Sequence, residues 1–279
     1  MPAIDQDTLQ RLDRCRDLSH SPGMRPVSDQ DHVIVFDGAH LRATCYFPDR
    51  ARLIVCFDHW RQERDGFPTR IAGAQGLEKF GCAVLNIHSH RNDWMLNAEL
   101  PELRAALQDS CSTYTDVTAF GFSMGGYSAL LLARNLHLAR AILISPQYSI
   151  QPTIVPFERR YLKEATAIRT DLDRFDLEFG KTLRGAVIYD PLWKEDRAHK
   201  KLICRDFPAL TPVPMWAGGH PAIKMIYEAR RWGEFLAQVA QPDPDMTRFM
   251  KLHKTVRAKS DRYFRAMTNH LAVRSNQRK

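Results

Sequence analysis

Short, almost uninterrupted apolar runs recur along the middle of the chain, and turns and segments with helical spacing separate them. Such a run is typical of a strand that is buried on both faces of a sheet. Strands that alternate with helices favour a parallel sheet with helices packed on both of its faces. The runs are residues 53–57, 83–87, 117–122, 141–144 and 186–189.

The two ends of this pattern differ from its middle. Residues 32–36 and 41–47 flank Asp37-Gly38-Ala39-His40, which predicts a β-hairpin. Residues 211–216 form a weaker strand, and its prolines favour an edge of the sheet. The expected fold class is therefore α/β, a mostly parallel, doubly wound sheet with an N-terminal antiparallel hairpin. Helical segments are expected at about 70–80, 124–135, 159–179 (a crossover with a small cap over the site) and 221–240.

A chain of 279 residues is long enough for one α/β domain with short extensions. We expect an N-terminal helix and linker over residues 1–30, a single α/β domain over 31–242 and a basic helical tail over 243–279. The tail explains the net charge of +8, because residues 247–279 hold ten Lys or Arg and one Asp. That segment carries +9, and the rest of the chain therefore sums to −1.

The apolar residues of the tail recur at spacings near three, four and seven, between lysines and arginines. This pattern predicts one or two amphipathic helices with a basic face. The favoured interpretation is an accessory helix docked on the domain. The alternative is a contact with an anionic surface or a protein partner, and no recognised nucleic-acid motif accompanies the tail.

Composition argues against several classes of protein. No apolar stretch approaches the roughly 18 residues of a membrane span, and the N-terminus lacks the pattern of a secretory signal. The six cysteines form no C-x-x-C pair, and Cys45, Cys56 and Cys82 lie inside apolar runs. Buried free thiols are therefore favoured over a disulfide framework. We expect a cytoplasmic location, no metal and no cofactor.

Residues 121–126 read Gly-Phe-Ser-Met-Gly-Gly, a G-x-S-x-G pattern directly between an apolar strand and a helix. In this context the serine occupies a strained turn that raises its hydroxyl above the sheet, where bulky neighbours two positions away would collide with strand and helix. Ser123 is therefore predicted to be a nucleophile, although it could simply cap the helix. The backbone N–H of Met124, at the helix N-terminus, is expected to point at a developing oxyanion.

A serine nucleophile needs a base and a group that orients the base. His220 follows Gly218-Gly219 after the last strand, which suits the base, although Gly-Gly-His could be only a polar turn. Asp190 ends the preceding strand and Asp196 begins the next helix, so both compete for the third place. We favour Asp196, because its loop is long enough to carry it towards His220, and keep Asp190 as the alternative.

Together these residues resemble the α/β-hydrolase superfamily over about residues 33–240. The resemblance rests on the Gly-Phe-Ser-Met-Gly-Gly motif, which is similar to that of many esterases, on Gly218-Gly219-His220 and on the order serine, acid, histidine. It implies an eight-stranded, mostly parallel sheet with the triad at the C-terminal ends of its strands. It also implies a second oxyanion donor in the loop after the third strand, here His59 or Trp60, although the glycines common in that loop are missing.

The sequence thus predicts a serine hydrolase that cleaves a carboxylic ester through an acyl-enzyme, with acyl transfer as a close alternative. The loops after the strands are aromatic and basic, which favours a polar ester such as an acylated sugar or polysaccharide. A second hypothesis is a non-catalytic α/β-hydrolase-like binding or assembly module that uses the basic tail. The candidate substrate-binding residues are Arg61, His90, Trp94 and Trp193.

Overall fold

The computed structural model describes residues 32–62, 64, 66–67 and 76–276. The expected N-terminal helix and linker, Cys15 and most of the helix expected at 70–80 lie outside the described residues. Within the part of the chain that is described, no helix is long and apolar enough to cross a membrane.

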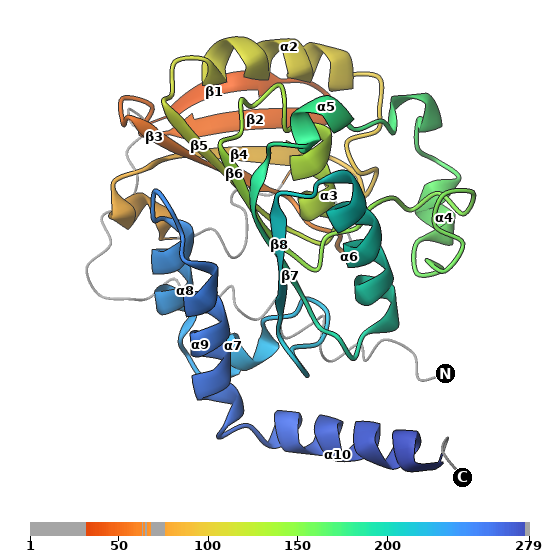
Figure 1. Cartoon of the computed structure of the whole chain (residues 1–279). Helices are drawn as coiled ribbons and strands as arrows, with labels where there is room; N and C mark the ends of the chain where they lie inside the picture. Colours follow the sequence, from red (N-terminus) through yellow and green to blue (C-terminus); the bar gives the residue numbers. More distant parts are fainter. Residues whose placement is uncertain (1–31, 63, 65, 68–75, 277–279) are drawn as a thin grey trace.

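An eight-stranded sheet runs through the molecule in the order β1-β2-β4-β3-β5-β6-β7-β8 (Figure 1). β2 pairs antiparallel with β1 and with β4, whereas all pairs from β4 to β8 are parallel. The predicted mostly parallel sheet with a leading antiparallel pair is confirmed, and the proline-containing strand lies at an edge. The strands are β1 (His32–Asp37), β2 (Leu41–Tyr46), β3 (Arg52–Phe57), β4 (Ala83–Ser89), β5 (Asp116–Phe122), β6 (Arg140–Ile144), β7 (Arg184–Tyr189) and β8 (Leu210–Pro214).

Helices cover both faces of the sheet, as the apolar runs predict. Successive side chains of β3 alternate between two hydrophobic clusters: Leu53 and Val55 belong to one, Ile54 and Cys56 to the other. The first cluster includes residues of α2 (Leu100–Cys111), α3 (Met124–Leu131) and α6 (Lys194–Asp206). The second includes residues of η3 (Leu77–Phe80), α7 (Lys224–Glu228) and α8 (Trp232–Val239).

Two expected helices differ in the structure. The single helix expected over 221–240 is wrong, because Arg230 adopts a left-handed conformation (φ 56°) and separates α7 from α8. The break lets α8 take a new direction, along which Trp232 and Phe235 stack on each other and pack against Phe120 of β5. The helix expected to reach residue 135 ends at Leu131.

The segment between β6 and β7 does not form the helix expected over 159–179. It contains three short elements, α4 (Leu162–Ala165), η4 (Thr170–Leu172) and α5 (Leu177–Gly180), joined by turns. The backbone is extended at Arg169 (ψ 92°) and again at Asp176 (ψ 95°), so a continuous helix is interrupted at both residues.

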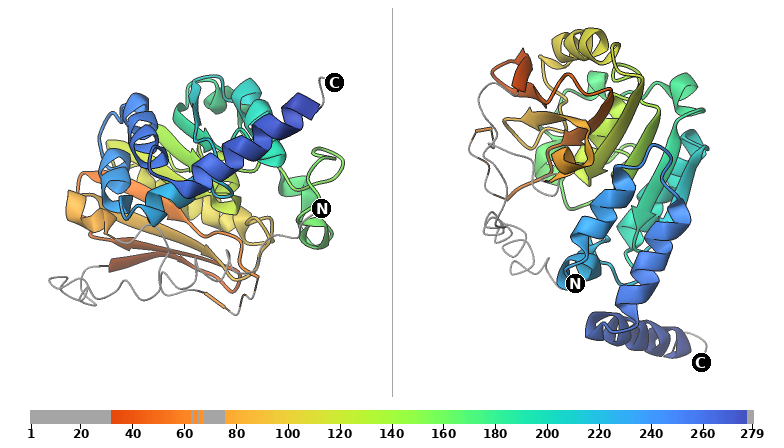
Figure 2. Two further views of the ribbon diagram at one scale, coloured as in Figure 1. Left: turned by 90° about the horizontal axis from the view of Figure 1, so that it is seen from below. Right: turned by 90° about the vertical axis from the view of Figure 1, so that its left-hand side faces the viewer.

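The C-terminal segment forms two helices, α9 (Met246–Arg257) and α10 (Asp261–Asn276). Asp245 caps α9 by accepting a hydrogen bond from Thr247 N–H at 2.8 Å. α9 packs against the α/β domain, where its Phe249, Leu252 and Val256 are buried in the second cluster. α10 runs at an angle to α9 and away from the sheet, and its Phe264 and Leu271 are exposed (Figure 2).

Candidate active site

Ser123 lies in the turn between β5 and α3 with φ 48° and ψ −112°. Residues other than glycine rarely adopt such a positive φ, so the backbone at Ser123 is strained. The flanking glycines allow the turn to form: a Cβ at Gly121 would lie 2.5 Å from the carbonyl oxygen of Gly125. A Cβ at Gly125 would lie 2.7 Å from the carbonyl oxygen of Asp58. Side chains at these two positions would therefore force strand and helix apart.

The structure brings Ser123, His220 and Asp196 together. His220 Nε2 lies 3.1 Å from Ser123 Oγ, and His220 Nδ1 lies 2.8 Å from Asp196 Oδ1. The Asp196 carboxylate is buried, and Ser123 is 8% exposed. With the proton on Nδ1, the imidazole donates to Asp196, and Nε2 can accept the proton of the serine hydroxyl. A donor–acceptor chain of this geometry can activate a serine towards an acyl carbon.

The hydrogen bonds described for the Asp190 carboxylate go to backbone groups and not to the imidazole. This carboxylate accepts hydrogen bonds from the backbone N–H groups of Leu192 at 2.9 Å, Ala217 at 3.1 Å and Gly219 at 2.8 Å. Burial raises the pKa of Asp190 above its ordinary value despite these bonds. Asp190 therefore ties the loop that carries His220 to the end of β7.

The loop after β3 lies against the start of α3, as the close approach of Gly125 to Asp58 shows. Asp58 is buried and forms ion pairs with Arg64 at 2.9 Å and Arg61 at 3.2 Å. Burial raises the pKa of Asp58, but His88 and the two arginines outweigh burial, so the pKa lies below its ordinary value. An ionised Asp58 thus holds this loop next to the helix N-terminus.

Comparisons with known proteins support the architecture. No protein-family model and no curated protein matches the sequence. The glycosylation associate protein (Gap123) complex from Streptococcus agalactiae is 14% identical with a TM-score of 0.54, over 74% of this chain and 46% of that one. A capsule O-acetyltransferase of Neisseria meningitidis serogroup A is 13% identical with a TM-score of 0.52, over 74% of this chain and 94% of that one.

A third solved structure, ESTFA in its FE-lacking apo form, is 14% identical with a TM-score of 0.51, over 86% of this chain and 91% of that one. The fold is α/β-hydrolase-like. At these identities the likeness concerns the fold, so the chemistry of this α/β-hydrolase-like chain is argued from its own residues.

Two of the four candidate substrate-binding residues, Trp193 and Trp94, occupy very different places. The Trp193 ring lies 6.2 Å from the His220 ring, next to the proposed base. Trp94 is fully buried, and its indole N–H donates to Gln147 Oε1 at 2.7 Å. A buried Trp94 does not present a face to a ligand. It instead packs against Tyr161, with ring centroids 5.0 Å apart.

The other two candidates, Arg61 and His90, belong to the loops after β3 and β4. The Arg61 guanidinium is engaged by Asp58, and its backbone N–H donates to Asn92 Oδ1 at 3.1 Å. The ring of His90 packs edge-on against Phe67.

Among the described residues, no group of three His, Cys, Asp or Glu side chains comes together as a set of metal ligands.

The segment between β6 and β7 supplies residues that sequence reasoning missed. Tyr161 is nearly buried next to Ser123, and burial raises the pKa of its hydroxyl. The guanidinium of the preceding residue, Arg160, lies 3.8 Å from Asp196 Oδ1 and pairs with Glu158 at 2.5 Å. No periodicity marks these residues in the sequence, because the segment is irregular.

A buried ion network lies behind the candidate triad. Glu158 Oε2 lies 2.9 Å from His199 Nε2, and His199 Nδ1 accepts the Tyr148 backbone N–H at 3.1 Å. Since Nδ1 is an acceptor, the proton of His199 lies on Nε2 and is donated to Glu158. Burial raises the pKa of Glu158, but the bonds from His199 and Arg160 outweigh burial and hold the pKa well below its ordinary value. Glu158 thus stays ionised and fixes Arg160 beside Asp196.

Proposed function

We propose that this protein cleaves or transfers an ester-linked acyl group, with Ser123 as the nucleophile. The observation that carries the proposal is the hydrogen-bonded chain from Ser123 Oγ through His220 to Asp196, at a strained turn between strand and helix. A helix cap would not need a strained serine, and a polar turn would not need a histidine held between a hydroxyl and a buried carboxylate.

The proposed reaction has two halves. Ser123 Oγ attacks the ester carbonyl carbon while its proton passes to His220 Nε2, and Asp196 stabilises the imidazolium that forms. The tetrahedral intermediate then collapses, the C–O bond to the alcohol breaks, and His220 returns the proton to the departing oxygen. Water, or the hydroxyl of another acceptor, attacks the acyl-enzyme with His220 again as the base and releases Ser123.

Two backbone N–H groups are proposed to hold the oxyanion. The first is that of Met124 at the start of α3, where the helix dipole favours negative charge. The second lies in the loop after β3. His59 N–H is already donated to Asp58 Oδ1 at 3.0 Å, which favours Trp60 N–H for this role.

A polar ester, such as an acylated saccharide, is the proposed substrate class. Trp193 beside His220 offers an aromatic face on which a sugar could stack. Acyl transfer to a saccharide hydroxyl is the second candidate, because one fold neighbour is a capsule O-acetyltransferase. A cytoplasmic place of action is part of the proposal, since Cys45, Cys56, Cys82 and Cys111 are buried free thiols.

Labelling with a fluorophosphonate probe tests the proposal directly. We expect the full-length protein to react covalently at Ser123, and Ser123→Ala to remain unlabelled at the same thermal unfolding temperature. No labelling of folded wild type would contradict an activated serine and favour the binding or assembly module. If labelling succeeds, a panel of acetyl esters with and without added polyols separates hydrolysis from transfer by the ratio of acetate to acetylated polyol.

A further inference from the structure

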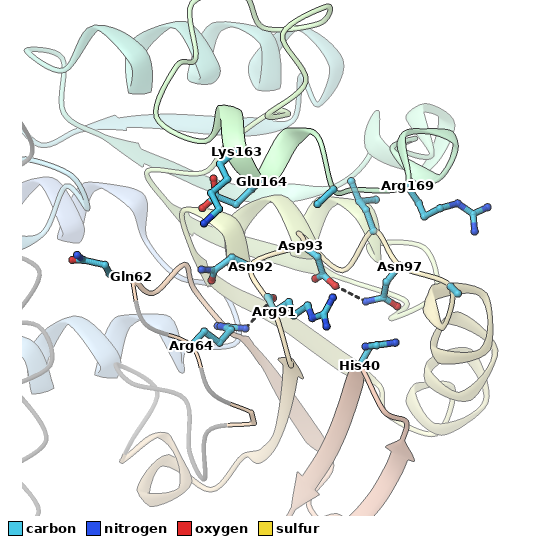
Figure 3. Close-up of a pocket in the computed structure, with 13 residues that line it drawn as sticks. His40, Gln62, Arg64, Arg91, Asn92, Asp93, Asn97, Lys163, Glu164 and Arg169 are labelled. Carbon is cyan, nitrogen blue, oxygen red and sulfur yellow. Dashed lines mark hydrogen bonds between the residues drawn. The ribbon is translucent and has the colours of Figure 1, made fainter.

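A cavity of about 530 Å³ opens beside the loops after β3 and β4 and beneath α4. Figure 3 shows residues from four separate stretches around it, with Lys163 and Glu164 on the side opposite Asn92 and Asp93. Its size is that of an ordinary small-molecule site. Most of the residues that line it are polar or charged, among them Gln62, Arg91, Asp93, Lys163 and Glu164.

The acidic groups of this cavity already accept hydrogen bonds. Glu164 Oε1 accepts the Trp60 indole N–H at 2.7 Å. Asp93 Oδ1 accepts from Ser89 Oγ at 2.6 Å, and Asp93 Oδ2 accepts from Asn97 Nδ2 at 2.8 Å (Figure 3). These hydrogen bonds hold the cavity walls in place and use acceptor atoms of both carboxylates, and because their donors are neutral the two carboxylates keep their negative charge beside the four Lys and Arg of the lining.

Some of the Lys and Arg side chains of the cavity form ion pairs and others do not. Arg64 pairs with Asp58, and Arg169 pairs with Asp171. Arg91 and Lys163 are exposed, and neither has an ion-pair partner among the residues that the structure describes.

The start of the Arg91 side chain is fixed, because its carbonyl oxygen accepts bonds from Ser89 Oγ at 2.8 Å and Arg64 Nη1 at 3.1 Å. Gln62, whose amide N–H₂ can also donate, is exposed on the same cavity. Arg91, Lys163 and Gln62 are thus cationic or neutral hydrogen-bond donors. Such donors match a ligand that has many acceptor oxygens and a negative charge.

Ser123 is not among the residues that line the cavity, but aromatic side chains in contact with one another lie between the two. The Trp60 indole donates to Glu164 on the cavity side, and its ring packs edge-on against Tyr161, 6.0 Å between centroids. Tyr161 in turn lies near Ser123, which affects the pKa of the Tyr161 hydroxyl. Ser123 is only 8% exposed, so the larger polar part of a substrate has to lie outside its immediate surroundings.

We propose that this cavity binds the anionic group, a carboxylate or a phosphate, of the polar alcohol part of the ester. Arg91 and Lys163 neutralise the anion, Gln62 donates to neighbouring oxygens, and the acyl group reaches Ser123 past Trp60. The substrate class is then an ester of an acidic saccharide or a similar hydroxyl-rich anion. The inference rests on the proposed function, and it concerns binding, which can be measured without turnover.

The test uses full-length Ser123→Ala protein and isothermal titration at low ionic strength with glucuronate, glucose 6-phosphate and glucose. We expect at least one anion to bind and glucose not to bind at the same concentration. Arg91→Ala combined with Lys163→Ala should weaken anion binding by about tenfold, since two solvent-exposed charge contacts are lost. Preference for glucuronate identifies a carboxylate as the bound group, and preference for glucose 6-phosphate identifies a phosphate.

Lys201→Ala is the matched control, because it removes an exposed positive charge from α6, outside the cavity lining, and should leave binding unchanged. Absence of anion binding, equal binding of glucose, or unchanged binding in the double variant would overturn the inference. The same double substitution with Ser123 intact should still react with the fluorophosphonate probe. Failure of that probe on wild type concerns the proposed function, whereas failure of anion binding concerns only the cavity.

Discussion

Ser123 shows how single residues hold a strained turn in place. A left-handed conformation of this kind costs on the order of 1–3 kcal/mol, so neighbouring contacts must maintain it. Ser123 N–H donates to the carbonyl of Ile144 at 2.9 Å, and its own carbonyl accepts from Tyr127 N–H at 3.1 Å. Strand and helix thus both fix the serine, and its hydroxyl is presented to His220 before any substrate arrives.

Replacing each of the two aspartates separates their roles. Asp196→Asn should lower kcat by about 10³–10⁴-fold, because the amide no longer holds the imidazole in the tautomer that accepts the serine proton. Asp190→Asn should instead lower the free energy of unfolding by about 1–3 kcal/mol, since buried N–H groups of the His220 loop lose a charged acceptor. Ester hydrolysis rates and urea unfolding curves of both variants provide the measurement.

The comparison of these two variants is made per folded molecule. If Asp190→Asn loses more turnover than Asp196→Asn at equal folded fraction, the assignment of the acid is reversed. Glu195→Gln is a suitable control, because Glu195 is the helix neighbour of Asp196 and has no hydrogen bond to His220 in the described structure.

At the scale of elements, we expect the docking of α9 to depend on pH. His253, on its buried face, is 3.1 Å from the carbonyl oxygen of Trp216, and burial lowers its pKa to about 4. In the unfolded chain a histidine titrates near 6.5, so between these values the unfolded state binds more protons. The stability that neutral His253 contributes is therefore complete above about pH 6.5 and is lost as the pH falls towards 4.

His253→Leu should remove this dependence. Between pH 7 and pH 5 the wild-type protein should lose about 2 kcal/mol more of its free energy of unfolding than the variant, as the two pKa values require. Urea denaturation at both pH values provides the measurement. Equal losses in the two proteins would show that His253 is not buried in its neutral form.

Elements differ in how far the sequence predicts them. β3, β5 and β6 are predictable because a strand buried on both faces leaves a continuous apolar run. The Leu100–Cys111 helix was missed although its apolar residues recur every three or four positions after Pro101. The break at Arg230 was not predictable, because it depends on the packing of Trp232 onto Phe120 in three dimensions.

The candidate site follows the same division. Ser123 and His220 were identifiable because each follows a strand and stands beside glycines that the local backbone requires. Tyr161 and Arg160 were not, since they come from an irregular segment whose path is set by tertiary contacts. The sequence favoured Asp196 over Asp190 but did not decide between them, because the composition of a loop does not determine how far the loop extends.

At the scale of the whole molecule, the net positive charge comes from the C-terminal segment, because residues 247–279 carry +9 and the rest of the chain −1. Deleting residues 261–279 removes five Lys or Arg and one Asp, which lowers the net charge from +8 to +4. α10 buries little of its surface, so fluorophosphonate labelling should not change, and the unfolding temperature should shift by no more than a few degrees. The truncated chain should elute from heparin at a lower salt concentration than the full chain. Equal elution would show that α10 is not the contact for anionic surfaces.

The order of strands in the sheet sets the distances between the residues of the candidate site. Ser123 follows β5, Asp190 and Asp196 follow β7, and His220 follows β8, so the spacing of about 4.8 Å between neighbouring strands sets how far apart these groups begin. A slip of β8 by one residue would move the His220 loop by about 3.3 Å, more than a hydrogen bond tolerates. Because β8 is an edge strand, we expect that local fraying of β8 would move His220 away from Ser123 while the rest of the sheet remained folded.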